Sequence, residues 1–231
     1  MTPRIPRLAL QAAALTLSAG VAFAAGLPLN IEDVDTAGLP DVGDEWLTEN
    51  PYRDGTHDVW TRAIAVGESA YTQNCARCHG LGAISGGLAP DLRMLAAADY
   101  DDEWFTERFR EGMTQNGVTK MPAFGDLLSQ ETAWAIRTYI ETRPDEQMVM
   151  AESSGLKDLR DELVAWSKGE GTPDNAAMKA KLDEIASRID TLSGAPVADS
   201  VAFHASGQLD GTPESYALAA ETLTVGLSVH Q

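Results

Sequence analysis

The pentapeptide CARCH, residues 75–79, holds both cysteines of the 231-residue chain, with a histidine directly after the second. Three positions separate Cys75 from Cys78, which places the two side chains about one turn apart on a helix. A disulfide between them would close a very short loop and would leave His79 without a role. A structural zinc ion would need more ligands, and the chain has no other cysteine to supply them.

The C-x-x-C-H spacing is typical of covalent haem c attachment. Two thiols one turn apart can add to the two vinyl groups on one side of the porphyrin, and the residue that follows then faces the iron with its imidazole. A redox-active dithiol and a zinc half-site are the competing interpretations. We interpret the motif as the attachment site of one haem c, held by Cys75 and Cys78, with His79 as an iron ligand.

A second axial ligand is sought after His79, where the methionines are Met94, Met113 and Met121. Met121 stands directly before a proline, a position that disfavours helix, and a methionine in a loop can be directed at a metal. Met94 and Met113 flank helix-like stretches and are expected to fill the core. Met121 is therefore the predicted ligand, and a histidine–methionine pair suits electron transfer. The other histidines, His57, His204 and His230, lie outside this segment and are expected to be solvated.

Further residues are expected close to the haem. The carbonyl of Pro90, in the Gly-Pro loop ISGGLAPDLR, is placed in sequence to accept the second ring N–H of His79, although a simple turn would explain the same residues. Arg77 and Arg93 are candidates for contact with the haem propionates, with surface ion pairs as the alternative. Lys120 adjoins Met121 and is interpreted as an ordinary surface lysine.

Three helices are expected around these residues. Apolar residues at helical spacing predict the first over 60–71, leading into the motif. An acidic start and a terminal glycine predict the second over 101–112, and the third follows Ser129 as its N-cap and stops before Pro144. No segment shows a strand pattern, so an all-α fold with long loops is predicted. The aromatic residues expected in the core are Trp104, Phe105 and Phe109.

The order of these features resembles that of a class I monohaem cytochrome c. In that family a glycine of the first helix packs against an aromatic residue of the last, and Gly67 and Tyr139 match those positions. The strings VDTAGLPDVGDEWLTENPYR, NCARCHGLGAISGGLAPDLR, DEWFTERFREGMTQNGVTKMPAFG and LLSQETAWAIRTYIETR are similar to the periplasmic cytochromes c-550 that serve PQQ-dependent alcohol dehydrogenases. This resemblance covers residues 34–143. It implies a protein that accepts single electrons from such a dehydrogenase and passes them, through a downstream cytochrome or oxidase, towards a terminal oxidase.

The first residues have the layout of a secretory signal peptide. Arg4 and Arg7 precede an apolar run, and small residues around Ala24 form a cleavage site of the A-x-A type. An uncleaved membrane anchor is the alternative, but polar residues interrupt the run. Cleavage would remove two positive charges and change the formal net charge from −18 to −20. So acidic a protein is not expected to bind nucleic acid or anionic lipid, and it is expected in the periplasm without stable membrane insertion.

The chain is therefore divided into a signal peptide (1–24), an N-terminal extended segment (25–58), a cytochrome c haem domain (59–146) and a C-terminal helical extension (147–231). The extension lies outside the resemblance. Apolar stripes predict a helical hairpin over 154–193, with a seam that runs on to Leu192, and a loose tail with one more helix from Pro213 to about Thr224. These helices are expected to pack on the haem domain or on each other; a docking arm or a dimer contact is the alternative.

The sequence thus predicts a diffusible electron carrier and not an enzyme. Two other functions stay open. A haem enzyme or ligand sensor would have an open sixth position on the iron, and Met121 would then have no role as a ligand. A fixed cytochrome subunit of another periplasmic oxidoreductase complex would use the tail helices to bind a partner chain.

Overall fold

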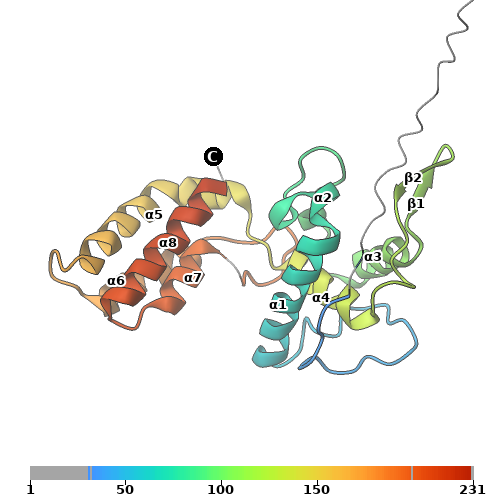
Figure 1. The fold of residues 1–231 in the computed structure, drawn as a ribbon, viewed down its shortest axis with the longest axis horizontal. Coiled ribbons are helices and arrows are strands. Elements are labelled where there is room, and N and C mark those ends of the chain that lie inside the picture. The colour runs from blue at the N-terminus through green and yellow to red at the C-terminus, as the bar shows by residue number, and fades with distance from the viewer. Residues whose placement is uncertain (1–30, 32, 199, 230–231) are drawn as a thin grey trace, which may run out of the picture. The chain divides into compact units, whose positions relative to one another are not determined.

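The computed structural model describes residues 31–229 except Glu32 and Asp199. The predicted signal peptide, its cleavage site near Ala24 and His230 lie outside the described residues. Within them the chain is mostly helical, and the predicted all-α fold is confirmed (Figure 1). Among the described helices, none is both long enough and apolar enough to span a membrane.

The motif lies in the first half of the fold, among four α-helices and two short 3-10 turns. The three long helices begin and end close to the residues that the sequence patterns indicate, whereas the two 3-10 turns were not predicted. Ser129, for example, caps α4 by accepting a hydrogen bond from the Thr132 N–H. The elements are α1 (His57–Asn74), α2 (Ala76–His79), η1 (Leu81–Ala83), η2 (Leu92–Met94), α3 (Asp99–Glu111) and α4 (Gln130–Glu141).

Helices α1 and α4 pack with their backbones in contact at Gly67. A Cβ atom added to Gly67 would lie 2.0 Å from the carbonyl oxygen of Ala135 and 2.8 Å from the Cβ of Tyr139. Only glycine allows so close an approach. The expected contact between Gly67 and Tyr139 is therefore confirmed. It sets the position of α1 against α4, and with it the position of the CARCH motif at the end of α1.

A two-stranded antiparallel hairpin separates α3 from α4 and was not expected from the sequence. Its strands are β1 (Met113–Gln115) and β2 (Val118–Met121). The turn between them contains Asn116 and Gly117, with φ angles of +52° and +74°. Asn-Gly is the preferred pair for such a tight turn because both residues tolerate positive φ. The prediction that no strand occurs is wrong for this segment.

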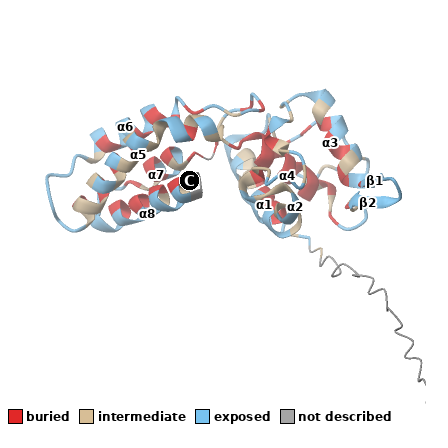
Figure 2. Ribbon diagram, turned by 90° about the horizontal axis from the view of Figure 1, so that it is seen from above, coloured by how far each residue is buried: buried red, intermediate tan, exposed pale blue. Residues whose placement is uncertain are grey.

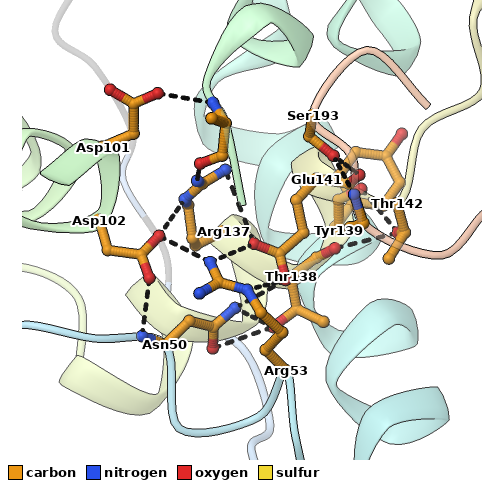
Figure 3. A network of polar contacts seen from close by, with 12 residues as sticks. Asn50, Arg53, Asp101, Asp102, Arg137, Thr138, Tyr139, Glu141, Thr142 and Ser193 are labelled. Carbon is orange, nitrogen blue, oxygen red and sulfur yellow. Dashed lines mark hydrogen bonds and ion pairs between the residues drawn. The ribbon is translucent and has the colours of Figure 1, made fainter. Parts of the chain in front are cut away.

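A network of buried polar side chains joins the N-terminal segment to α3 and α4 (Figure 3). The Asp102 carboxylate accepts hydrogen bonds from Arg137 Nε and Arg53 Nη2, both at 2.8 Å, and from the Asn50 N–H at 3.0 Å. Arg53 also donates to Glu141 at 2.8 Å. The side chains of Asp102, Arg137 and Glu141 are all 0% exposed, so each charge depends on its partners.

The C-terminal residues form four further helices with a core of their own. They are α5 (Glu146–Ser167), α6 (Asn175–Ala186), α7 (Val201–Gln208) and α8 (Pro213–Val229). Helix α5 begins earlier than the predicted hairpin, and α6 ends before the end of the predicted seam, which leaves Leu192 outside the helix and 39% exposed. Helix α7 was not predicted, and α8 runs five residues beyond the predicted end at Thr224. The division into domains stays a prediction.

Burial differs from expectation at three residues. Phe105 and Phe109 are buried as predicted, but Trp104 is 37% exposed and its ring lies under the Arg108 guanidinium, 5.7 Å from carbon to ring centroid. Met94 and Met113 are 66% and 41% exposed. The expectation that both methionines fill the core is wrong. Met113 belongs to a hairpin whose strands are mostly exposed (Figure 2), and Met94 is the exposed last residue of η2.

Candidate haem site

The CARCH motif lies where α1 passes into α2. Cys75 is the C-cap of α1, and its N–H donates to the Tyr71 carbonyl at 2.8 Å. The same residue is the N-cap of α2, and its carbonyl accepts the His79 N–H at 3.0 Å. The single turn of α2 therefore holds both thiols and the imidazole in a fixed order along one short helix.

Both cysteines are free thiols in the described structure. Cys75 is half-buried and packs against the apolar core of the domain, whereas Cys78 is exposed. Burial, and to a smaller extent the neighbouring Cys78, raises the pKa of Cys75 to about 12. One thiol of the motif therefore lies against an apolar cluster and the other is exposed.

The ring of His79 is held from one side. Its Nδ1 lies 3.1 Å from the carbonyl oxygen of Pro90. When Nδ1 carries the proton and donates to this carbonyl, Nε2 has its lone pair available for a metal. The predicted supporting residue and the predicted ligand are therefore brought together.

The chain after His79 is fixed by two residues that sequence reasoning did not connect with the site. Gly80 has a φ of +85°, and a Cβ atom on it would lie 1.8 Å from the Ile84 carbonyl oxygen. The buried Tyr71 donates its hydroxyl to the Gly80 carbonyl at 2.9 Å. The glycine after the motif was a visible signal for a tight backbone turn, whereas nothing in the sequence linked Tyr71 to it.

Met121 is the last residue of β2 and is half-buried. It packs against the same apolar cluster as Cys75. Gly112, at the end of α3, passes so close that a Cβ atom there would lie 2.5 Å from the Met121 carbonyl oxygen. The backbone of Met121 therefore lies directly against the end of α3. The buried members of the cluster are Ala70, Tyr71, Ala83, Phe105, Phe109, Phe124, Leu128, Ala133, Ile136, Tyr139 and Ile140.

The two arginines differ in their surroundings. Arg77 is exposed on α2. Arg93 is buried and pairs with Asp91, with 3.0 Å between Nε and Oδ1 and 2.7 Å between Nη2 and Oδ2. Burial acts to raise the pKa of Asp91, but the hydrogen bonds from Arg93 outweigh it and the pKa is lowered. Arg93 thus already has a carboxylate partner, and its contact with a propionate stays a prediction.

The residues present fit a covalently bound haem c. Two free thiols stand one turn apart, an imidazole next to them has one nitrogen hydrogen-bonded and the other available, and a thioether packs on the same apolar cluster. When bound, the haem supplies reversible one-electron chemistry at its iron. The protein has only to hold it, orient its ligands and limit the access of water.

The chain resembles several known cytochrome domains. It is 52% identical over 111 residues to cytochrome c550 of Pseudomonas aeruginosa, covering 47% of this chain and 74% of that protein. Quinohemoprotein alcohol dehydrogenase ADH IIB of Pseudomonas putida is 37% identical over 36% of this chain, and FixP, a cbb3-type cytochrome c oxidase subunit of Rhizobium meliloti, is 31% identical over 34%. These matches cover only 11% and 29% of the two larger proteins.

A family model described as cytochrome C oxidase, cbb3-type, subunit III matches residues 62–140. No solved structure matches significantly. A helical domain with a C-x-x-C-H turn and a methionine on one apolar cluster is a class I cytochrome c, a protein that transfers electrons through covalently bound haem c. This chain belongs to that family, alongside cytochrome c550.

Proposed function

We propose that this chain is an exported, diffusible carrier in the periplasm that accepts single electrons from a PQQ-dependent alcohol dehydrogenase. It would pass them to a downstream cytochrome or oxidase, towards a terminal oxidase. In this proposal Cys75 and Cys78 hold the haem, His79 and Met121 are the iron ligands, and Pro90 orients His79. The supporting geometry is the hydrogen-bond distance from His79 to Pro90 and the shared apolar cluster of Cys75 and Met121.

One observation carries the choice of electron donor. In two quinohemoprotein alcohol dehydrogenases of Pseudomonas putida, a segment similar to this chain is part of the same polypeptide as the dehydrogenase. A domain of this kind therefore works beside that chemistry in those proteins. The same partnership between separate chains would require docking, and electrostatic attraction is the usual way to make such docking fast.

The charge of this chain indicates the kind of surface it would dock to. Residues 25–146 contain 22 acidic residues against 9 lysines and arginines, a net charge of −13. A basic patch on the dehydrogenase would attract this surface at low ionic strength. The attraction would weaken as salt shortens the Debye length, from about 30 Å at 0.01 M to about 3 Å at 1 M.

The test is stopped-flow reduction of the oxidised holoprotein by the PQQ-dependent alcohol dehydrogenase from the same cell, with alcohol present and over a range of salt. We expect fast reduction that slows several-fold as salt rises. Omission of alcohol is the first control, and reduction by a small uncharged reductant, which should not depend on salt, is the second. If the dehydrogenase does not reduce a cytochrome whose haem spectrum is intact, the proposed donor is wrong.

A fixed subunit is the second candidate, because FixP and the dehydrogenases carry similar domains as parts of larger assemblies or chains. It makes a different prediction for size-exclusion chromatography of the full chain mixed with the dehydrogenase. A diffusible carrier elutes separately at high salt. Stoichiometric co-elution that persists at high salt would favour the fixed subunit.

A further inference from the structure

The C-terminal helices are joined to the haem domain at the segment that follows Pro90. The connection between α6 and α7 supplies Ser193, whose carbonyl accepts the Ala97 N–H at 2.9 Å and whose hydroxyl donates to the Glu141 carbonyl at 2.5 Å. Close by, the Asp145 N–H donates to the Asp190 carbonyl at 2.7 Å. These bonds hold the start of α5 near η2.

A chain of charged groups runs from α5 back towards the motif. Glu146 is the first residue of α5, and its Oε2 lies 3.9 Å from Arg93 Nη2. The same nitrogen donates to Asp91 Oδ2 at 2.7 Å, and Arg93 Nε donates to Asp91 Oδ1 at 3.0 Å. The Arg93 side chain is only 7% exposed, and those of Asp91 and Glu146 are 26% and 29% exposed. Salt screens partly buried pairs of this kind less than surface pairs.

The last connection is through the backbone. The carbonyl of Pro90 and the nitrogen of Asp91 belong to one peptide unit, which is rigid and planar. A movement of the Asp91 backbone that tilts this peptide unit therefore also turns the carbonyl that lies 3.1 Å from His79 Nδ1. A strong hydrogen bond at that nitrogen makes an imidazole ligand more basic, which favours the oxidised metal and lowers the reduction potential.

We propose that Glu146 is a positioning residue for His79: through Arg93 and Asp91 it holds the Pro90 carbonyl against the imidazole and so keeps the reduction potential low. The inference rests on the proposed role of His79 as an iron ligand. It gives the C-terminal helices a function in the electron-transfer site itself, since the link begins at the first residue of α5.

The first experiment measures the midpoint potential of the full-length holoprotein and of two variants. Glu146→Gln should raise the equilibrium constant for reduction about threefold, or roughly 28 mV at 59 mV per tenfold for one electron. Glu152→Gln is the matched control, because it removes one negative charge from the same helix but its partner is Arg188, which is 44% exposed. That control should leave the potential unchanged. The optical spectrum checks that both variants keep the ligated haem.

A second pair of variants distinguishes positioning from a direct effect of charge. Glu146→Gln is introduced into an Arg93→Met background, which lacks the link to Asp91. If Glu146 acts through Arg93, more than half of the shift should be lost in this background. The proposal is overturned if at least half of the shift remains, or if Glu146→Gln causes no shift when Arg93 is present.

A direct readout of the His79 hydrogen bond completes the test. In the reduced protein, hydrogen exchange of the His79 ring N–H by NMR should be about threefold faster in Glu146→Gln and unchanged in Glu152→Gln. Equal exchange in the two variants would contradict the proposed link. None of these measurements involves a dehydrogenase, so their failure would leave the proposed electron donor untouched.

Discussion

At the residue scale, two methionines at the ends of the hairpin have identical side chains but different surroundings. Met113 and Met121 are paired across β1 and β2. Met113 is 41% exposed, whereas Met121 packs against the apolar cluster that also contacts Cys75. A methionine held by a rigid backbone next to an apolar cluster is well suited to reach a metal.

Substitution of these two methionines tests the sixth ligand. Met121→Ala should open the iron, so that the reduced protein binds carbon monoxide, and should lower the potential by a substantial part of the ~0.8 V range that axial ligands span. The measurements are optical spectra with and without carbon monoxide and a potentiometric titration. Met113→Ala is the control and should change neither. An unchanged Met121→Ala spectrum would instead favour a haem enzyme or ligand sensor with an open sixth position.

The buried Asp102 carboxylate predicts a large effect on stability. Asp102→Asn removes the negative charge that Arg137 and Arg53 share, and removal of one partner from a buried charge pair costs about 3–5 kcal/mol. Glu103→Gln, an exposed neighbour on α3, should change the free energy of unfolding by less than about 0.5 kcal/mol. Denaturant unfolding of the two holoprotein variants measures the difference. Equal stabilities would mean that the network contributes little.

At the element scale, the helices could be predicted because their ends carry local signals. Ser129 accepts a hydrogen bond from the first turn of α4, as its position indicated, and Gly112 ends α3. Such signals act within one turn of the chain, so one sequence is enough to read them. The positions of the CARCH motif and of the loop that contains Pro90 could be predicted for the same reason, because the residues of the motif lie close together in sequence.

The elements and contacts that were not predicted have weak sequence signals or depend on residues far apart in the chain. The strands of the hairpin are three and four residues long and mostly polar, so alternation could not reveal them, although Asn116-Gly117 was a usable signal. Helix α7 is only eight residues long. The contact of Arg93 with Glu146 joins residues far apart in sequence, and no pattern in a single chain reports such a contact.

The close contact of α1 and α4 gives a sharp prediction at this scale. A Cβ atom at Gly67 would lie 2.0 Å from a backbone oxygen, so Gly67→Ala has to move a helix and should destabilise the fold by at least about 1–3 kcal/mol. Gly155 in α5 is the matched control, because its added Cβ would meet only Ile185 Cδ1 at 3.8 Å. Gly155→Ala should stabilise by about 0.5–1 kcal/mol. Equal effects of the two changes on denaturant unfolding would contradict the described packing.

At the scale of the whole molecule, the described residues have separate cores. One cluster draws its buried members from residues 149–227, and two others draw theirs from residues 52–140. The contacts between the two parts that involve the 190–198 segment are mainly backbone and polar ones. Such contacts can orient a side chain in the folded state without making the two cores unfold together, because apolar burial supplies most of the cooperativity.

Paired core substitutions test this independence. Leu182 in the C-terminal core and Ile136 in the haem-side core are both buried, and truncation of either to alanine should cost about 2–5 kcal/mol. Leu182→Ala should lower the melting temperature of the C-terminal helices, followed by far-UV circular dichroism, and should leave the melting temperature followed by haem absorbance unchanged. Ile136→Ala should lower the melting temperature followed by haem absorbance and leave that of the C-terminal helices unchanged. If each substitution moves both transitions equally, the molecule unfolds as one unit, and the C-terminal helices contribute to the stability of the haem site as well as to its proposed tuning.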